Sequence, residues 1–475
     1  MPPIWQAEEV LRAMRGQCLH EQSWTARGVA IDSRAVQPGD IFVALKGPVH
    51  DAHGFTGQAF ANGAAAAIVQ RAPSQVPPDA PLIFVEDTFT ALQDLGRVGR
   101  QRSGAKIVAV TGSVGKTSSK EMLRLMLGAV GDTYANEGSF NNHWGVPLSL
   151  ARLPAGANYG VFEVGMNHAG EMGPLAREVQ PHVALITNVE AAHLEYFASV
   201  EAIADAKAEI FLGMDSGGIA VLNRDNAHYA RLLAAARTQG LRRIVSFGRD
   251  SKADARLLSL AATPNGNEVK ANILGQNLTF LVGVPGAHMA FNAVGTLLAA
   301  AAAGASPEIC AAALERYRIP AGRGGRQTLH TPSGSFLLID ESYNASPVAV
   351  RAAIHALGQT EVASSGRRTA VLGDMRELGA TAPQLHADLA ESLVAARIDT
   401  VHTCGAMMER LYNVLPPALR GHHAPDSATL APLVAAEVQA GDVVMVKGSH
   451  SMELTKVIAA LKALESTTQN KAAAE

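Results

Sequence analysis

The stretch VAVTGSVGKTSSKEM holds the residues of this sequence with the clearest chemical potential. An apolar run, Lys106–Val110, leads into a glycine-rich turn that ends in Lys116 and Thr117, and a predicted helix follows. Backbone amides in such a turn can surround phosphate oxygens, a lysine can neutralise the β- and γ-phosphates, and a threonine hydroxyl can reach Mg²⁺. Val110 stands where the usual phosphate loop has its first glycine. The predicted nucleotide phosphate loop comprises Gly112, Ser113, Val114, Gly115, Lys116, Thr117 and Ser118.

Two further residues are candidates for a metal site beside this loop. Glu163 lies inside the apolar run YGVFEVGMN, where an unpaired charge would be costly. It therefore either pairs with an internal Arg or Lys or holds the Mg²⁺ of a phosphate site, and the GKT string favours the metal. His193 follows the predicted strand HVALITN and should emerge at the carboxyl edge of the same sheet. A lone histidine is often structural, so both interpretations of His193 remain open.

Other polar residues point less strongly to chemistry. Lys207 lies in ADAKAEIF, on a predicted helix among small and apolar residues, and this spacing by itself favours a surface lysine whose stem packs against the protein. His50, Asp51 and His53 are close in sequence and could suggest a metal site. Closely spaced His and Asp near a glycine turn more often cap a loop, so we predict capping here.

Composition narrows the class of protein. The chain has 475 residues, which favours about three domains, and its 48% hydrophobic content excludes wholesale disorder. A net charge of −3 offers no basis for coating nucleic acid. The three cysteines lack the spacing of a disulfide framework or a metal site, which indicates a reducing compartment. The N-terminus lacks the pattern of an export signal, and the apolar stretch from Ala293 is shorter than a membrane span. We expect a cytoplasmic protein without membrane insertion.

Strand-like and helix-like segments alternate through the chain and predict an α/β fold with three domains. Residues 1–104 read as a small α/β domain, and residues 105–318 as a parallel sheet covered by helices. Within the second domain, Ala255 to Val284 reads as short antiparallel strands. Residues 319–475 follow the glycine-rich hinge PAGRGGR and repeat the rhythm as a second open sheet.

Two other classes of protein find no support in the sequence. A guanine-specific switch would carry an Asn-Lys-x-Asp string, and the nearest match, LNRDN, lacks the lysine and the final aspartate. A serine hydrolase of the nucleophile-elbow type would carry G-x-S-x-G, which is missing. The phosphate loop is therefore interpreted as part of an enzyme that uses a nucleoside triphosphate.

Taken in chain order, these strings resemble the Mur ligase family, ATP-dependent enzymes that form amide bonds in bacterial cell-wall synthesis. TGSVGKTS is similar to the family's ATP loop, EVGMNHAGEM and ITNVEAAHLEYF to its two metal segments, and AKAEIF to the segment of its modified lysine. HMAFNAVGTLLAA and PAGRGGR are similar to its adenine segment and its hinge. The resemblance implies a UDP-binding N-terminal domain, a central P-loop ATPase domain and a Rossmann-like C-terminal domain for the acceptor.

Within the family, the chain is most similar to members that join D-alanyl-D-alanine to UDP-N-acetylmuramoyl-tripeptide. The strings that carry this likeness are SFNNHWGVPLSLA, DESYNASP, VLGDMRELG and VKGSHSMELTKV, and IDSRAVQPGDIFVALKG is similar to the UDP-sugar segment. Glu341, Ser346 and the string NEGSF depart from the usual pattern, which leaves the acceptor contacts open. The alternatives are a sibling ligase adding another amino acid, a folylpolyglutamate synthetase-like enzyme and a catalytically silent UDP-peptide-binding protein.

The resemblance also implies a mechanism, in which the tripeptide carboxylate attacks the γ-phosphate of ATP and the dipeptide amine then attacks the acyl phosphate. The implied catalytic residues are Lys116, Glu163, His193, Lys207 and Arg323, with Arg326 as the alternative to Arg323. The implied Mg²⁺ ligands are Thr117, Glu163, His193 and Lys207, the last N-carboxylated by carbon dioxide. Asn292 is expected at the adenine and Asp340 at the ribose. The expected substrate-binding residues are Ser33, Arg34, Lys46, Asn141, Asn142, Tyr343 and Asn344. The resemblance favours a monomer and leaves the third residue of the tripeptide open.

Overall fold

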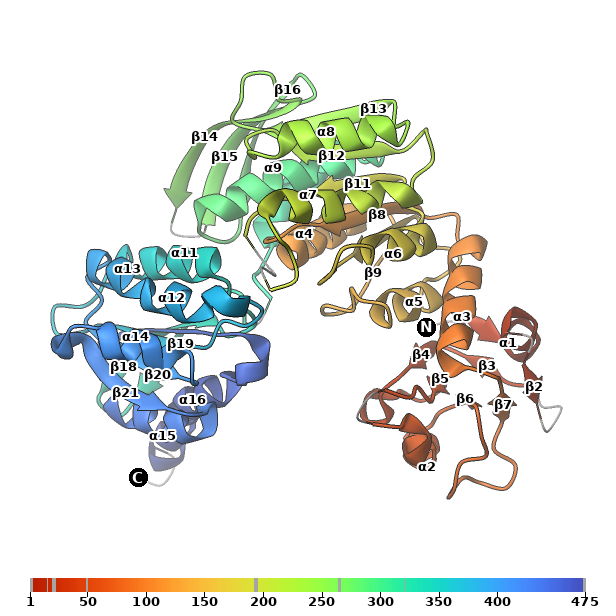
Figure 1. Cartoon of the computed structure of the whole chain (residues 1–475), viewed down its shortest axis with the longest axis horizontal. Coiled ribbons are helices and arrows are strands. Elements are labelled where there is room, and N and C mark those ends of the chain that lie inside the picture. Colours follow the sequence, from red (N-terminus) through yellow and green to blue (C-terminus); the bar gives the residue numbers. More distant parts are fainter. Residues whose placement is uncertain are drawn as a thin grey trace. The chain divides into compact units, whose positions relative to one another are not determined.

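The computed structural model describes residues 3–14, 16–18, 23–47, 50–191, 195–263, 266–320 and 322–472. The chain divides into two compact units, Met1–Val189 with Glu201–Tyr317, and Glu190–Val200 with Arg318–Glu475. The first unit holds two sheets that are mostly parallel, and the second unit holds a third such sheet. The predicted α/β class is therefore confirmed. Figure 1 shows each sheet with its covering helices.

The N-terminal sheet is short-stranded and buried on both faces. Its order, within the described residues, is β2 (Gln17–Cys18), β7 (Leu82–Phe84), β6 (Ala66–Val69), β5 (Asp40–Val43) and β4 (Gly28–Ala30). β2 is antiparallel to β7 and the other pairs are parallel. The continuous apolar runs of β5 and β6 are fully buried, as expected for parallel strands covered on both sides. A separate pair, β1 (Trp5–Gln6) and β3 (Thr25–Ala26), is antiparallel.

The central sheet contains nine strands within the described residues. Their order is β16 (Gln276–Val282), β15 (Gly266–Ile273), β14 (Ala255–Thr263), β13 (Arg243–Gly248), β12 (Ile219–Asn223), β11 (Val183–Ile186), β8 (Lys106–Thr111), β10 (Tyr159–Glu163) and β9 (Thr133–Ala135). Every neighbouring pair from β9 through β8 to β14 in this order is parallel, while β15 is antiparallel to both β14 and β16, as predicted for this segment. This antiparallel segment extends the central sheet instead of standing apart from it.

The described helices that flank the sheets have the following bounds. They are α1 (Ala7–Met14), α2 (Thr56–Ala61), α3 (Thr88–Arg102), α4 (Lys116–Gly128), α5 (Gly145–Ala151), α6 (Met172–Val179), α7 (Val200–Ala208), α8 (Tyr229–Thr238), α9 (Ala287–Ala302), α10 (Pro307–Ala313), α11 (Pro347–Gly358), α12 (Ala382–Ala387), α13 (Leu389–Ala395), α14 (Met408–Val414), α15 (Ser427–Glu437) and α16 (Thr455–Ala472). The apolar stretch from Ala293 forms most of α9, and Val294, Leu297 and Leu298 are fully buried there. The predicted buried helix is thus confirmed.

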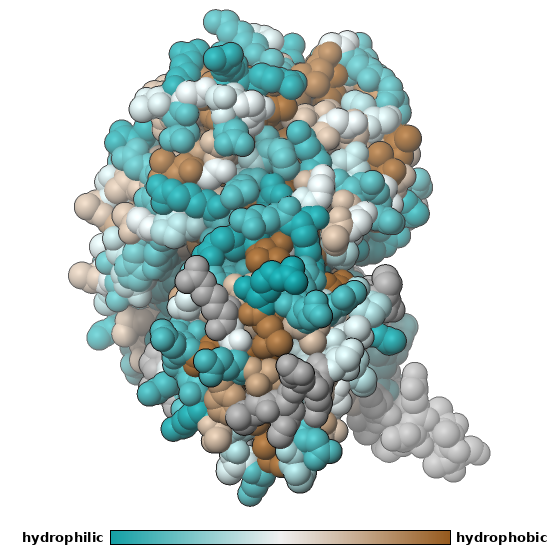
Figure 2. Space-filling view, turned by 90° about the vertical axis from the view of Figure 1, so that its right-hand side faces the viewer, coloured by the Kyte–Doolittle hydropathy of each residue, from teal (hydrophilic) through white to brown (hydrophobic). Residues whose placement is uncertain are grey.

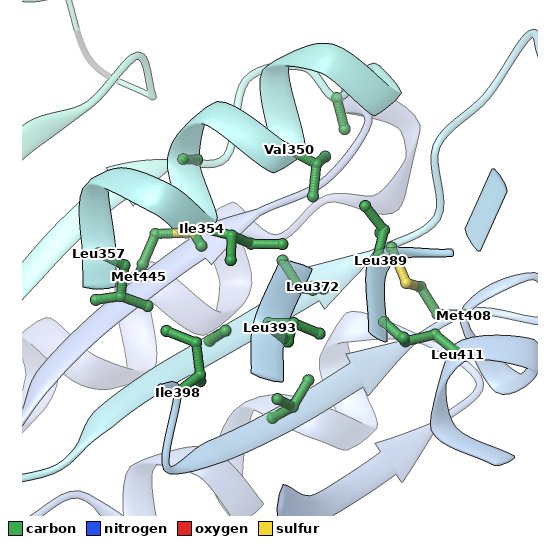
Figure 3. Close-up of a cluster of buried hydrophobic side chains, with 14 of the residues drawn as sticks. Val350, Ile354, Leu357, Leu372, Leu389, Leu393, Ile398, Met408, Leu411 and Met445 are labelled. Carbon is green, nitrogen blue, oxygen red and sulfur yellow. The ribbon is translucent and has the colours of Figure 1, made fainter. Parts of the chain in front are cut away.

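The C-terminal sheet carries separate hydrophobic cores on its two faces. Its order is β17 (Gly325–Thr331), β18 (Gly334–Glu341), β22 (Val443–Lys447), β19 (Arg368–Gly373), β20 (Thr400–Cys404) and β21 (Arg420–Ala424), with β17 antiparallel to β18 and the rest parallel. Figure 1 shows α11, α12 and α13 over one face and α15 and α16 over the other. Figure 3 shows the first core, where Ile354 of α11 and Leu393 of α13 meet Leu372 of β19 and Met445 of β22. These cores fix the strand ends that carry the predicted acceptor residues.

Hydrophilic side chains cover most of the face shown in Figure 2, and the hydrophobic ones form small groups. Across the described residues, every helix is too short or too polar to cross a membrane.

Helix α3 packs closely on α5 because two of its glycines face α5. A Cβ added at Gly96 would lie 2.8 Å from the carbonyl oxygen of Pro147, and one at Gly99 would collide with the carbonyl oxygen of Leu150. The Trp5 indole nitrogen also donates a hydrogen bond of 2.8 Å to the carbonyl of Ala151. These contacts join α3 and β1 to α5, the helix that precedes β10 in the chain.

We expect Gly99→Ala to lower the free energy of unfolding by about 1–2 kcal/mol, because the cost of overpacking exceeds the gain in helix propensity. Urea denaturation followed by tryptophan fluorescence measures the change. Gly128→Ala is the matched control, because Gly128 also lies in a helix and an added Cβ there meets nothing within 4 Å. Equal unfolding midpoints for wild type and Gly99→Ala would contradict this interpretation of the α3–α5 contact.

Candidate active site

Three neighbouring strands of the central sheet end at one edge and bring the predicted phosphate residues together. β8 lies between β10 and β11, with Glu163 paired to Val110 and Ile186 paired to Thr111. The chain leaves β8 into the glycine loop and α4, and it later crosses from β10 on one side of β8 to β11 on the other. Ligands of open parallel sheets collect at such a reversal of strand order. The predicted loop and Glu163 therefore share the edge at which a ligand is expected.

The loop after β8 depends on two glycines in positive-φ conformations. Gly112 has φ of 154° and Gly115 has φ of 83°. A Cβ at Gly112 would collide with the hydroxyl of Thr187, and one at Gly115 would lie 2.8 Å from the side-chain nitrogen of Asn292. The backbone is thus held against both side chains, and other residues would not fit there. The predicted adenine residue Asn292 accordingly lies beside the loop.

Hydrogen bonds from the end of β11 fix the rest of the loop. The Ser113 amide donates to the carbonyl of Asn188 (2.8 Å), and the Thr187 hydroxyl donates to the carbonyl of Val114 (2.7 Å). Ser118, in the first turn of α4, is buried. These contacts order the loop through groups that follow a separate strand.

The N-terminus of α4 supplies the positive end of a helix dipole at this edge. Gly115 is its N-cap, so the amides of the first helical turn have no intrahelical acceptors. The Lys116 ammonium donates to the carbonyl of Gly112 (2.7 Å) and therefore lies over the same loop. Amides of a first helical turn and an ammonium around one loop can neutralise the charge of a phosphate group.

Glu163 is a buried carboxylate held by two neutral side chains. The Thr117 hydroxyl donates to its Oε2 and the Asn141 amide to its Oε1, both at 2.7 Å, and the residue is 1% exposed. The alternative prediction, a pairing with an internal Arg or Lys, does not describe these contacts. Asn142 is directed differently, because its Oδ1 accepts from the amide of Gly145, the first residue of α5 (2.9 Å).

The oxygen atoms of Glu163 and Thr117 fit a hard divalent cation. Magnesium prefers oxygen ligands, keeps several waters and is often held in proteins by one or two carboxylates together with substrate phosphates. The described residues contain no group of three His, Cys, Asp or Glu side chains that could hold a metal by themselves. Glu163 and Thr117 would supply two of the oxygen ligands of a cation at this edge.

Lys207 is buried in α7 instead of lying on the surface. It is 2% exposed, so the spacing argument that favoured a surface lysine is wrong. Burial, and to a lesser extent the charge of Lys116, holds the pKa of the Lys207 ammonium well below its usual value of 10.5. A neutral amine at this position is a nucleophile, which suits the predicted addition of carbon dioxide. His193, the remaining predicted metal ligand, lies outside the described residues.

In the N-terminal domain, the predicted UDP residues follow two adjacent parallel strands. Ser33 and Arg34 lie in a short 3₁₀ turn (Ser33–Ala35) after β4, where Asp32 accepts from the Arg34 amide at 3.0 Å. Ser33 is buried, whereas the Arg34 side chain is exposed and paired with Asp32 at 2.7 Å. Because β4 and β5 are parallel, residues that follow them collect at one edge of the sheet.

Lys46 follows β5 and is bridged to the loop that contains the closely spaced histidines. It pairs with Asp51 in an isolated antiparallel bridge. Asp51 accepts hydrogen bonds from the backbone amide of His53 at 3.0 Å and from its ring nitrogen at 2.6 Å. The predicted loop capping is therefore confirmed. Trp144 lies against the same loop, because a Cβ at Gly47 would be 3.2 Å from its ring.

The C-terminal unit gathers the other predicted residues where β18 ends. The Arg323 guanidinium lies 3.9 Å above the ring centre of Tyr343. Asp340 accepts from the Ser342 hydroxyl (2.6 Å) and from the Gly322 amide (3.2 Å), which ties the hinge to the strand. The competing arginine, Arg326, is directed elsewhere, to the Thr360 hydroxyl after α11 at 3.4 Å.

Sequence reasoning missed a buried lysine in this unit. Lys447, at the end of β22, is 3% exposed and donates to Oε2 of Glu341 (3.1 Å) and to the carbonyl of Asn344 (3.0 Å). It thereby holds the loop that carries Tyr343 and Asn344. Glu341, which departs from the usual family string, thus has a buried partner from another strand. The position of Lys447 directly after the apolar run VVMV was the available signal.

Lys120, Asn136, Thr187 and Asn188 were also missed in the central domain. All four contact the loop, Glu163 or the segment that holds Glu163. Each follows or lies near a predicted strand or the GKT string, but their partners come from other strands. Spacing along the chain gives no information about such contacts.

Comparison with known proteins assigns the family. The profile of the Mur ligase middle domain matches residues 110–303, that of the Mur ligase glutamate ligase domain matches residues 325–450, and that of the Mur ligase catalytic domain matches residues 25–97. The UDP-N-acetylmuramoyl-tripeptide--D-alanyl-D-alanine ligase of Escherichia coli is 35% identical over 442 residues, which cover 92% of this chain and 94% of that protein. The chain belongs to the Mur ligase family.

Solved structures support the same assignment. The MurF of Acinetobacter baumannii matches with a TM-score of 0.81 and 30% sequence identity. The match covers 97% of this chain and 100% of that chain. The MurF ligase of Thermotoga maritima, solved in complex with ADP, matches with a TM-score of 0.74 and 26% identity, covering 93% of this chain and 98% of that one. This Mur ligase therefore has the three-domain fold of the family and is an ATP-dependent enzyme that forms amide bonds.

We expect Lys116→Ala to weaken binding of a nonhydrolysable ATP analogue by about 10- to 100-fold, since a hydrogen bond to a charged group contributes about 1.5–3 kcal/mol. Calorimetric titration measures the affinity. Lys106→Ala is the control, because Lys106 lies at the opposite end of β8. An unchanged affinity in Lys116→Ala would remove this lysine from the phosphate site.

Proposed function

We propose that this Mur ligase joins D-alanyl-D-alanine to UDP-N-acetylmuramoyl-tripeptide, with ATP converted to ADP and phosphate, and so makes the pentapeptide precursor of peptidoglycan. The likeness to the Escherichia coli ligase, which extends over nearly the whole of both chains, carries the proposal. The cluster of Lys116, Thr117 and Glu163 supports it, because a ligase of this kind must hold a triphosphate. We assign residues 1–104 to the UDP-sugar, residues 105–318 to ATP and residues 319–475 to the acceptor.

The reaction joins groups that repel one another, so alignment and charge neutralisation supply most of the catalysis. A carboxylate oxygen of the tripeptide attacks the γ-phosphorus, the bond from that phosphorus to the β-phosphate oxygen breaks, and ADP leaves. The dipeptide amine then attacks the acyl-phosphate carbonyl, the C–O bond to phosphate breaks, and the amine loses a proton. Lys116 and the first-turn amides of α4 hold the transferring group in line during the first step.

In this proposal Thr117 and Glu163 hold Mg²⁺, which when bound supplies positive charge against the phosphate oxygens. Lys207 attacks carbon dioxide through its neutral Nζ, forms an N–C bond and loses a proton, which converts a potential cation into an anionic carbamate. Its burial and lowered pKa support this step. We retain His193 as a further metal ligand.

The remaining residues are assigned to substrates. Ser33, Arg34 and Lys46 contact the UDP portion, and Asn141 faces the same edge as the carboxylate that it holds. Asn292 lies beside the phosphate loop and is assigned to the adenine. In the C-terminal unit, Asp340 is assigned to the ribose, Arg323 to the phosphate, and Tyr343 and Asn344 to the dipeptide. The position of Arg326 toward α11 favours Arg323 as the hinge arginine.

Purified protein should release phosphate only when ATP, the UDP-linked tripeptide and D-alanyl-D-alanine are all present. Replacing the dipeptide with diaminopimelate, lysine or glutamate, each with its matched UDP-linked acceptor, separates the sibling ligases. Phosphate release driven by one of these amino acids would assign the enzyme to another branch. A lack of ADP formation with every combination would favour a UDP-peptide-binding protein without catalysis.

We expect Lys207→Ala to lower phosphate release by about 100-fold or more, since it removes the carbamate proposed to support the Mg²⁺ that neutralises the phosphate charge. Bicarbonate should not restore the variant, whereas a short carboxylic acid should restore it in part. In ¹³C-bicarbonate, wild type should show a carbamate resonance that the variant lacks. Because the pKa of Lys207 is lowered, its neutral amine, and with it the carbamate, should persist to lower pH than those of an ordinary lysine. Full activity of the variant would contradict this role.

A further inference from the structure

Lys120 is a buried lysine that the proposed mechanism does not use. It lies in α4, one helical turn after Lys116, and is 0% exposed. Its ammonium donates to the carbonyls of Asn136 (2.6 Å) and Gly138 (3.0 Å), and it lies 2.8 Å from Oε1 of Glu121. An ammonium has three N–H donors, and burying it is costly unless they are satisfied. Three oxygen partners match that requirement.

The two carbonyls that Lys120 holds belong to the segment after β9, residues 136–142. Within this segment, Oδ1 of Asn136 accepts from the Glu163 backbone amide at 2.8 Å, and its side-chain nitrogen donates to the carbonyl of Phe140 at 3.1 Å. The carbonyl of Asn141 accepts from the Gly165 amide at 2.8 Å. The segment therefore holds the end of β10 at Glu163 itself and two residues beyond it.

Helix α4 thus reaches both oxygens of the Glu163 carboxylate. Thr117 donates directly to Oε2, and Asn141, at the end of the segment that Lys120 holds, donates to Oε1. Thr117 and Lys120 are three residues apart, so they share one face of the helix. If the segment moved, Oε1 would lose its donor while Oε2 kept its own, and the carboxylate would be free to rotate.

The cation at position 120 is itself fixed by its helix neighbours. Burial by itself would raise the pKa of the Glu121 carboxyl, but hydrogen bonds from Lys120 and Arg124 hold that pKa below its usual value. Oε1 of Glu121 pairs with Lys120, and Oε2 pairs with Arg124 at 2.7 Å. The Lys120–Glu121 pair faces inward and the Arg124–Glu121 pair faces outward. Because both pairs share Glu121, removal of Arg124 is a matched control for removal of Lys120.

We propose that Lys120 is a positioning residue that fixes the orientation of the Glu163 carboxylate and so sets the affinity of the nucleotide site for Mg²⁺. The proposal rests on the proposed function, which places Mg²⁺ at Glu163 and Thr117. Groups that orient a metal ligand typically change metal affinity by about 10- to 100-fold when they are removed. The effect should therefore fall on the metal-dependent part of nucleotide binding and spare the metal-free part.

The test is calorimetric titration of the full chain with a nonhydrolysable ATP analogue, first in EDTA and then at increasing Mg²⁺. Lys120→Met keeps a long unbranched side chain and removes the ammonium. We expect its affinity in EDTA to stay within about twofold of wild type, while the Mg²⁺ concentration that gives half of the maximal gain rises by about tenfold or more. Arg124→Met, which removes the outward partner of Glu121, should behave as wild type.

Asn136→Ala provides a second variant, which leaves Lys120 in place and removes the contact with the Glu163 amide. It should show the same rise in the Mg²⁺ concentration that gives half of the maximal gain, so the test holds even if Lys120→Met does not fold. Equal losses with and without Mg²⁺, or a normal Mg²⁺ response in a folded variant, would overturn the positioning role. A wild-type protein whose analogue binding ignores Mg²⁺ would instead contradict the proposed metal site, and the role of Lys120 with it.

Discussion

The buried carboxylate of Glu163 imposes the constraint on which the described part of the proposed nucleotide site depends. A carboxylate taken out of water must recover hydrogen bonds for its oxygens, or its burial destabilises the fold. Thr117 and Asn141 satisfy the two oxygens, and Asn136 receives the backbone amide of the same residue. The phosphate loop, the segment after β9 and the end of β10 are therefore held by one set of contacts, and a change in any of them reaches the others.

Two buried lysines near this site meet the cost of burial in opposite ways. Lys120 surrounds its ammonium with two carbonyls and a carboxylate, so its charge serves as a structural link. Lys207 lies where burial and the charge of Lys116 favour the neutral amine, so its chemistry is that of a nucleophile. Lys120 therefore holds a neighbouring segment in place, whereas Lys207 has a reactive amine. The difference comes from the oxygens and charges around each side-chain nitrogen.

The parts of the site that sequence reasoning predicted are those that depend on short-range order. A strand, a glycine turn and a helix that follow one another in the chain predict a glycine loop that leads into a helix N-terminus, so the loop from Gly112 to Thr117 could be expected from the sequence. Apolar runs likewise predicted the sheet strands and helix α9. The environment of Lys207 was predicted wrongly, because helical spacing does not reveal which neighbouring elements cover a face. Asn141 and Asn142 also differ in their contacts, because Asn141 donates to Glu163 whereas Asn142 accepts from the Gly145 amide, and nothing in the string distinguishes the two.

The sequence by itself determined the α/β class, the phosphate loop and the family resemblance, because these follow from periodicity and from residues that are adjacent in the chain. Tertiary structure decided which groups satisfy the buried charges. Lys120 and Asn136, Asn141 and Glu163, and Lys447 and Glu341 are pairs from different elements. Their contacts exist only because parallel strands end at a common edge, where side chains distant in sequence meet out of water and must supply one another's hydrogen bonds.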